Sequence, residues 1–182
     1  AYPDSARRSE KYYAQVDTFD LAEGQYLEVL KIVGDPPTDK KNNPPYGESQ
    51  KLLGSLYMTK RQYTKAIDAF RKAQSVGMDD DNVHLSWGQA VLQTLDPKDA
   101  EEEGRRKNAD ALKHFRISVE KNPGNVQGHF WLGECLVRSR VPGDDPGNKK
   151  LIEEACSEWR KVLKLDPKNE EAKKGLERIS CP

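Results

Sequence analysis

The 182-residue chain has three cysteines, two methionines, few aromatic residues and no long apolar run. A membrane-spanning helix needs about 18 or more consecutive apolar residues, and no stretch comes near that length. The N-terminus also lacks the apolar core of a signal peptide. We therefore predict a protein without a membrane span. Because the chain begins at Ala1 and not at methionine, a leader that was removed earlier stays open as an alternative, and so does the compartment.

An excess of positive charge is absent as well. The chain has 30 Lys and Arg residues and 30 Asp and Glu residues, so its formal net charge is zero, and the two signs are interspersed. Proteins that neutralise phosphate backbones need a basic surface. We therefore predict that no nucleic acid is among the partners.

Residues that could carry out chemistry are scarce. The histidines and cysteines are His84, His114, His129, Cys135, Cys156 and Cys181. No pair among them has the spacing of metal ligands or of redox-active cysteines. A glycine-rich phosphate loop, a nucleophile elbow and a Ser-His-Asp constellation are also missing. We predict no catalytic residue, no metal site and no cofactor, and hence a protein that is not an enzyme.

What the chain does contain is a recurring unit. In residues 52–73, LLGSLYMTKRQYTKAIDAFRKA, a glycine in one predicted helix is followed by an alanine and an aromatic residue in the next. A second glycine stands 34 residues after the first, and a third copy follows. The three sets are Gly54, Ala66 and Phe70; Gly88, Ala111 and Phe115; and Gly133, Ala155 and Trp159. Glycine inside a helix costs about 1 kcal/mol relative to alanine, so close approach of a partner helix must offset it.

This pattern resembles the tetratricopeptide repeat, a helix-turn-helix unit of 34 residues. The resemblance implies an all-α, tetratricopeptide-type helical-hairpin solenoid, wound into a right-handed superhelix and closed by a C-terminal capping helix. The predicted organisation is an atypical N-terminal helix pair with a proline-rich linker at 1–46, three repeats at 47–80, 81–125 and 126–169, and the capping helix at 170–182. The predicted helices cover residues 5–17, 20–33, 47–60, 63–76, 81–95, 101–121, 126–139, 149–165 and 170–179.

Two of the three copies carry insertions. Eight residues separate Tyr57 from Ala66 in the first copy, but 19 and 18 residues separate the equivalent positions in the second and third. The inserted stretches, LDPKDAEEEGRRKN and VRSRVPGDDPGNKK, fall at the turn inside a repeat and should project from one edge, where insertions often mark a binding face. The alternative is that their charged parts only lengthen the second helix. A loop is predicted at Pro142, Gly143, Pro146 and Gly147.

The cysteines are predicted to be structural. Cys135 and Cys156 align with apolar residues of the other copies, so both are expected in the core, where free cysteine behaves as a small hydrophobic residue. Cys181 is the one candidate for a reactive or paired thiol. The odd number of cysteines favours a reducing, cytoplasmic compartment. The acidic run at 79–81 is predicted to start a helix and not to bind a cation.

In tetratricopeptide proteins the first helices line a concave groove for extended or helical peptides, and the resemblance implies the same here. The family positions that face the groove correspond to a mixed set of side chains in this sequence. The predicted partner-binding residues are Lys51, Ser55, Leu85, Gln89, Gln93, Phe130, Trp131, Glu134 and Arg138. Phe130 and Trp131 are neighbours on one helix and point about 100° apart, so at least one should face the groove.

One subtype of the family clamps the C-terminal carboxylate of heat-shock chaperones with Lys, Asn and Arg side chains. At the five equivalent positions, Lys51 fits, and Ser55, Ser86, Gln127 and Trp131 occupy the rest. The clamp is therefore absent. The resemblance favours a non-enzymatic adaptor that binds a peptide segment of a protein partner as a subunit of a larger complex. The alternative is a self-assembling structural scaffold; a homo-oligomer is compatible with the first interpretation and required by the second.

Overall fold

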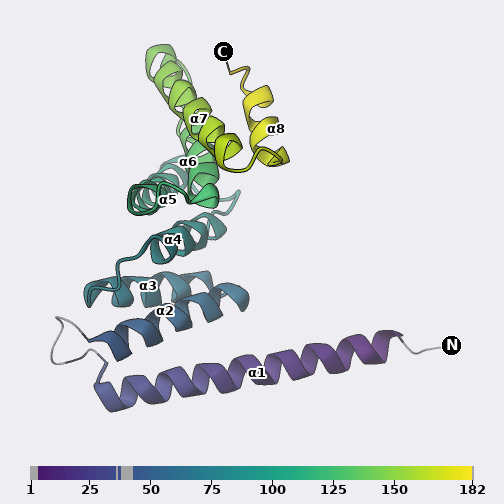
Figure 1. Cartoon of the computed structure of the whole chain (residues 1–182), viewed down its shortest axis with the longest axis vertical. Coiled ribbons are helices and arrows are strands. Elements are labelled where there is room, and N and C mark those ends of the chain that lie inside the picture. Colours follow the sequence, from purple (N-terminus) through teal and green to yellow (C-terminus); the bar gives the residue numbers. More distant parts are fainter. Residues whose placement is uncertain (1–3, 36, 38–42, 182) are drawn as a thin grey trace. The chain divides into compact units, whose positions relative to one another are not determined.

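The computed structural model describes the backbone of residues 4–35, 37 and 43–181, and the side chains of these residues from Thr18 onward (Figure 1). Within this part of the chain all regular secondary structure is helical, which confirms the all-α prediction. No helix among these residues combines the length and the apolar composition needed to cross a bilayer. The helices are α1 (Asp4–Val33), α2 (Pro44–Thr59), α3 (Tyr63–Ser75), α4 (Asp81–Gln93), α5 (Glu101–Lys121), α6 (Val126–Arg138), α7 (Asp145–Leu165) and α8 (Glu170–Arg178).

The N-terminal helix pair predicted at 5–17 and 20–33 is wrong, because one continuous helix, α1, covers both segments. The sequence has no proline or glycine between residues 17 and 20, so nothing local breaks the helix there. The linker predicted before residue 47 falls partly outside the described residues. Its last part begins α2, where the Asn43 side chain caps the helix by accepting a hydrogen bond from the Tyr46 amide at 3.2 Å.

The loop predicted around Pro146 and Gly147 is also wrong at those two positions, because α7 already begins at Asp145. Proline is compatible with the first helical turn, where its missing N–H has no intrahelical partner to lose. The Asp144 side chain caps this end by accepting from the Gly147 amide at 3.1 Å. The insertions mainly lengthen the second helices: α5 and α7 have 21 residues each, against 13 in α3.

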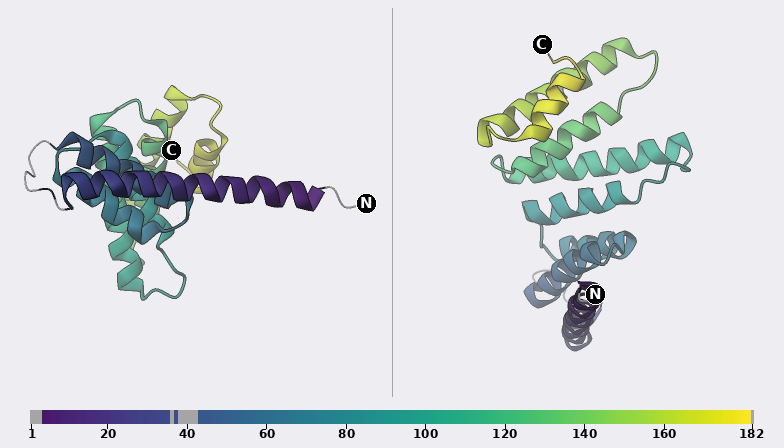
Figure 2. Two further views of the ribbon diagram at one scale, coloured as in Figure 1. Left: turned by 90° about the horizontal axis from the view of Figure 1, so that it is seen from below. Right: turned by 90° about the vertical axis from the view of Figure 1, so that its right-hand side faces the viewer.

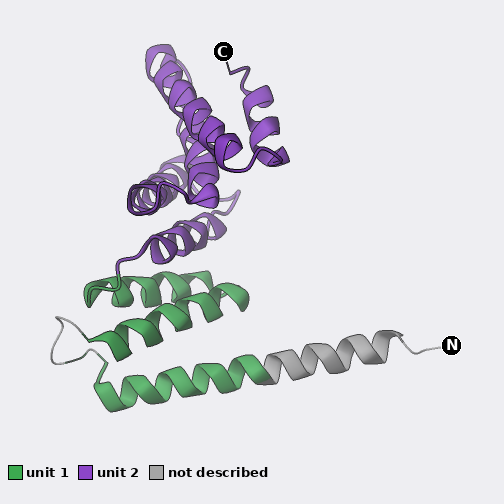
Figure 3. Ribbon diagram, in the orientation of Figure 1, with its two compact units in different colours: residues 1–78 green, residues 79–182 purple. Residues whose placement is uncertain are grey.

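The chain divides into two compact units, Ala1–Met78 and Asp79–Pro182 (Figure 3). In the first unit, α1 packs against the α2–α3 hairpin through a shared apolar core. The buried members of this core are Leu30, Tyr46, Leu53, Leu56, Ala69 and Val76. Polar contacts at the edge add to the apolar ones: Lys60, which directly follows α2, pairs with Asp20 at 2.6 Å and with Glu23 at 2.5 Å. The helix α1 therefore covers the apolar face that the first hairpin would otherwise expose.

The second unit contains two helical hairpins, α4–α5 and α6–α7, followed by α8 (Figure 2). Each helical glycine of the repeat pattern lies against the aromatic ring of its partner helix. A Cβ atom on Gly88 would lie 2.8 Å from the Phe115 ring, and one on Gly133 would lie 2.5 Å from Trp159 Nε1. The close approach predicted at these glycines is thus present, but the partner is the ring itself.

Candidate functional site

The predicted partner-binding residues fall in both units. Lys51 and Ser55 lie on α2 of the first unit, and the Ser55 hydroxyl donates to the Lys51 carbonyl at 3.2 Å. The other predicted residues lie on α4 and α6 of the second unit, where a side-chain hydrogen bond of 3.4 Å joins Gln89 to Gln127. Leu85 and Gln89 are half-buried, and Gln93 is exposed.

A pocket with a volume of about 460 Å³ lies at the N-terminal end of α6. We call it the aromatic pocket; it is lined by Val126, Gln127, Phe130, Trp131, Asn169 and Glu171. Phe130 and Trp131 are both half-buried, and their ring centroids are 5.3 Å apart in an edge-to-face arrangement. The structure therefore brings both aromatic residues to one pocket, although they diverge along the helix. Trp131 also stacks near the Phe115 ring, with 6.3 Å between centroids.

Contacts with its cap residue, with α5 and with α7 fix the N-terminal part of α6. Asn125 caps the helix by accepting from the Gly128 amide at 2.9 Å. A Cβ atom on Gly128 would lie 2.9 Å from Val119 Cγ1, so α6 and α5 are close here because position 128 has no side chain. In addition, the Trp159 indole N–H of α7 donates to the Phe130 carbonyl at 3.2 Å. These contacts fix the backbone that presents the two aromatic side chains.

The second wall of the aromatic pocket comes from α8, and sequence reasoning missed it. Asn169 caps α8 by accepting from the Ala172 amide at 2.9 Å, and Glu171 is exposed in the first turn. The asparagine is a recognisable helix start, but no signal in the sequence places it beside Phe130 and Trp131. The predicted ligand contact Glu134 also meets α8: Arg178 donates to its carboxylate at 2.7 Å, and the Glu134 side chain is only 14% exposed. Arg138 is exposed at the end of α6.

A larger cavity of about 680 Å³ lies between α5 and α7. Two ion pairs line it: Arg116 with Glu154 at 2.7 Å and Lys161 with Glu158 at 2.8 Å. At its floor, buried Glu158 accepts from His129 at 2.5 Å and from Lys161 at 2.8 Å. Burial raises the pKa of Glu158, but the hydrogen bonds from His129 and Lys161 outweigh it, so the pKa lies below its ordinary value. This cavity therefore offers paired charges, whereas the aromatic pocket offers ring surface.

The two remaining histidines belong to the core of the α4–α5 hairpin. His84 Nδ1 lies 2.9 Å from His114 Nδ1, and His84 Nε2 lies 2.6 Å from the Asp79 carboxylate. Burial, with the nearby His84 and Lys113, lowers the pKa of His114 to about 3, so this ring is neutral near pH 7. Among the described residues, no group of three or more His, Cys, Asp or Glu side chains is placed to hold a metal ion.

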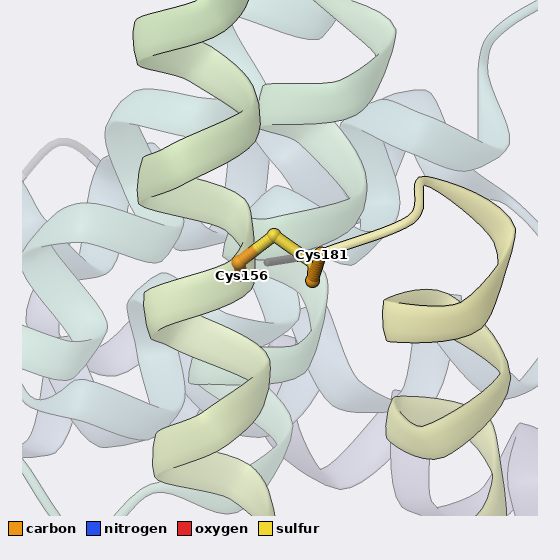
Figure 4. Close-up of a disulfide and its surroundings, with 2 residues drawn as sticks. All are labelled: Cys156 and Cys181. Carbon is orange, nitrogen blue, oxygen red and sulfur yellow. A yellow bond between two sulfur atoms is a disulfide. The ribbon is translucent and has the colours of Figure 1, made fainter.

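Of the two cysteines predicted to be free in the core, Cys135 is free and Cys156 is not. Cys135 is buried and free, and burial raises the pKa of its thiol to about 12. Cys156 is buried as predicted, but it is not free, because it forms a disulfide with Cys181 (Figure 4). The prediction erred because a separation of 25 residues fits no local cysteine motif. Only the path of α8 back along α7 brings the two residues together.

Comparison with known proteins gives similarity in sequence and in structure. No model of a known protein family matches the chain. The chain is 30% identical over 132 residues to the heat shock protein STI1 of Saccharomyces cerevisiae. The aligned residues are 72% of this chain but 19% of that protein, so the similarity covers a small part of a longer relative.

One similar solved structure is the first TPR of Spaghetti (RPAP3) bound to the HSP90 peptide SRMEEVD. Its sequence is 22% identical and its TM-score is 0.58. The alignment covers 76% of this chain and 94% of that one. MamA is 17% identical with a TM-score of 0.65, covering 98% and 84% of the two chains. YrrB, described as a TPR protein with an unusual peptide-binding site, is 19% identical with a TM-score of 0.62, covering 93% and 80%. At these identities the similarity is one of fold.

Proposed function

The chain has the fold of the tetratricopeptide repeat proteins, and from this premise we propose that it is a non-enzymatic adaptor that binds a peptide segment of a protein partner through the aromatic pocket. Two of the similar structures support a peptide as the ligand. The RPAP3 domain is bound to an HSP90 peptide, and YrrB is described by its peptide-binding site. The adaptor would serve as one subunit of a larger complex.

The observation that carries this proposal is the aromatic pocket itself. Phe130 and Trp131 are half-buried, and each keeps part of its surface open to the pocket. Tryptophan is among the residues most enriched where truncation removes most of the binding energy of an interface. The amide of Gln127 and the carboxylate of Glu171 stand at the rim, where polar groups pair with a ligand backbone. The pocket thus suits an apolar ligand side chain flanked by polar contacts.

The ligand proposed here differs from the HSP90 peptide SRMEEVD of the similar structure. Gln127 and Trp131 occupy two of the positions at which the chaperone clamp needs basic or amide side chains, and Glu171 adds a negative charge to the same pocket. A peptide rich in carboxylates would be repelled by Glu171. We therefore propose a neutral or basic segment with an apolar anchor. Leu85, Gln89, Gln93, Glu134 and Arg138, in the same unit as the pocket, stay proposed contacts for the remainder of the ligand. Lys51 and Ser55 stay proposed partner-binding residues on α2 of the first unit.

The variant Trp131→Ala tests this function. We expect it to lose the partner recovered by affinity capture from the native lysate, while its melting temperature stays within a few degrees of wild type, because the ring is only half-buried. A matched control is Leu165→Ala, which truncates an exposed apolar side chain outside the pocket and should keep the partner. Retention of the partner by Trp131→Ala at wild-type affinity would refute the assignment and point to the surfaces of the insertions.

A self-assembling scaffold is the second candidate, and exposed apolar residues on α1 favour it. Leu21 is 65% exposed and Ile32 is 77% exposed. The two residues are eleven positions apart, which is about three whole turns of a helix, so their side chains lie on one face. A second copy of the chain could cover this face. The molecular mass in solution separates the two functions.

A further inference from the structure

The capping helix α8 is too short to be stable without tertiary contacts. It has nine residues, Glu170–Arg178, and isolated helices shorter than about 12 residues are marginal in water. It buries only Ala172 and Gly175 among its residues. A Cβ atom on Gly175 would lie 2.9 Å from the Trp159 ring, so the helix is docked closely on α7 but over a small area. Its position therefore depends on a few anchors.

Two anchors hold the C-terminal end of α8. The first is Arg178, which donates to Glu134 at 2.7 Å and lies 5.6 Å from the centroid of the Trp159 ring. The Arg178 side chain is 54% exposed and that of Glu134 is 14% exposed, so water screens this ion pair in part and its contribution to stability is modest. The second is the disulfide from Cys156, in the middle of α7, to Cys181 beyond the end of α8 (Figure 4). The covalent bond is the stronger of the two.

The same helix supplies part of the aromatic pocket. Asn169 and Glu171, at the other end of α8, form the wall that faces Phe130 and Trp131. If α8 leaves α7, this wall leaves with it. The disulfide thus holds one end of the docked helix α8, and the other end of α8 forms part of the candidate ligand site.

We propose that the Cys156–Cys181 disulfide is a redox latch that controls the aromatic pocket. This inference rests on the proposed function. In the oxidised chain α8 is docked and the pocket is complete; in the reduced chain α8 undocks in a large fraction of molecules, and affinity for the ligand falls. The disulfide thereby couples the redox state of the surroundings to partner binding.

The chemistry is thiol–disulfide exchange with a dithiol reductant. A thiolate of the reductant attacks the sulfur of Cys181, which is half-buried, whereas Cys156 is 1% exposed. The bond between the two protein sulfurs breaks, and Cys156 leaves as a thiolate that takes up a proton. The second thiol of the reductant then displaces Cys181 and forms the disulfide of the reductant. Two electrons pass to the protein, and both cysteines end as thiols.

Hydrogen exchange of the 182-residue chain tests the latch without a ligand. We expect reduction with dithiothreitol to accelerate amide exchange in α8 by about tenfold or more, while exchange in α4 and α5 stays unchanged. The variant Cys181→Ser should show fast exchange in α8 under oxidising conditions and no further response to dithiothreitol. Equal exchange of α8 in the oxidised and reduced chains would overturn the proposal.

Binding is then measured with a probe peptide selected from a displayed library on the oxidised chain and dependent on Trp131. Reduction, or Cys181→Ser, should weaken the peptide by about tenfold. Equal affinity in both redox states would refute the latch while leaving the proposed function intact. If selection yields no peptide that depends on Trp131, the proposed function fails, and the latch as a control of binding fails with it. In that case the exchange of α8 still shows whether the disulfide controls docking.

Discussion

At the scale of single residues, glycine has opposite roles at two kinds of helical position. Gly88 lies against the Phe115 ring, and an added Cβ would lie 2.8 Å from it. Gly104 lies in α5 with no atom within 4 Å of an added Cβ. The first glycine is required by close packing, whereas the second only weakens its helix.

We predict that Gly88→Ala lowers the free energy of unfolding by roughly 1 to 2 kcal/mol, because overpacking against Phe115 exceeds the gain in helix propensity. Gly104→Ala should raise it by about 0.5 to 1 kcal/mol, since only the propensity changes. Chemical denaturation of both variants gives the two values. Stabilisation by Gly88→Ala would show that the ring can move aside.

The buried pair of His129 and Glu158 is a second feature at this scale. The two ring nitrogens of His129 face oxygen acceptors, Glu158 Oε2 at 2.5 Å and the Pro123 carbonyl at 3.0 Å. The imidazole ring thus lies between a buried carboxylate and a backbone carbonyl. Glu158 also accepts from Lys161 at 2.8 Å, so both of its carboxylate oxygens have a partner.

The lowered pKa of Glu158 predicts a loss of stability in acid. A carboxyl group whose pKa is depressed by folding stabilises the fold above its unfolded pKa, near 4.5, and this contribution is lost as the pH falls through the folded pKa. We predict that Glu158→Gln destabilises by roughly 3 kcal/mol at pH 7 and that its difference from wild type shrinks below pH 4.5. Denaturation between pH 7 and pH 3 measures this, with the exposed Glu153→Gln as control. A difference that is constant with pH would contradict the assignment.

At the scale of helices, each of the three hairpins has a fully buried alanine in its second helix, where the two helices cross. Ala66, Ala111 and Ala155 are all 0% exposed, and each precedes the aromatic residue that meets the glycine of the partner helix. Alanine and aromatic residue together set how near the two helices of a hairpin can lie. The small residues that align between the copies of the repeat thus mark the places where the two helices of each hairpin cross.

We predict that Ala111→Leu destabilises the chain by roughly 1 to 3 kcal/mol, because the larger side chain overpacks the crossing of α4 and α5. Ala66→Leu should behave alike at the crossing of α2 and α3. Ala109→Leu, at an exposed position of α5, is the matched control and should change little. A neutral result at position 111 would mean that the crossing is loosely packed.

At the scale of the whole molecule, the chain consists of two compact units with different exposed surfaces. The first unit exposes apolar side chains on α1, and the second contains the aromatic pocket. The adaptor function needs the aromatic pocket, whereas the scaffold function needs the apolar face of α1. Formal neutrality of the chain leaves self-association without electrostatic opposition.

We predict a mass near 20.6 kDa in sedimentation equilibrium at all concentrations from micromolar to near millimolar, a result that would exclude the scaffold function because that function requires self-association. A mass that rises with concentration would favour the scaffold instead. The variant Ile32→Lys would then test whether α1 forms the interface, because a charge on its exposed face should restore the monomer.

The sequence by itself determined the helices of the three repeat-bearing hairpins and the sites at which they cross. A helix start was visible in the acidic run at 79–81, because carboxylates favour the N-terminal end of a helix and this signal acts on the backbone within a few residues. The glycine, alanine and aromatic positions were visible because the same crossing recurs. The chemistry of Trp131 marked it as a candidate for binding without any structure.

Only the tertiary structure decided which distant residues meet. The pairing of Cys156 with Cys181, the contact of Glu134 with Arg178 and the wall that α8 adds to the aromatic pocket all depend on where α8 docks. Local periodicity shows that α8 has an apolar face but not which part of α7 it covers. Docking is set by the sum of many contacts between segments far apart in the chain, and a pattern within one segment does not contain that sum.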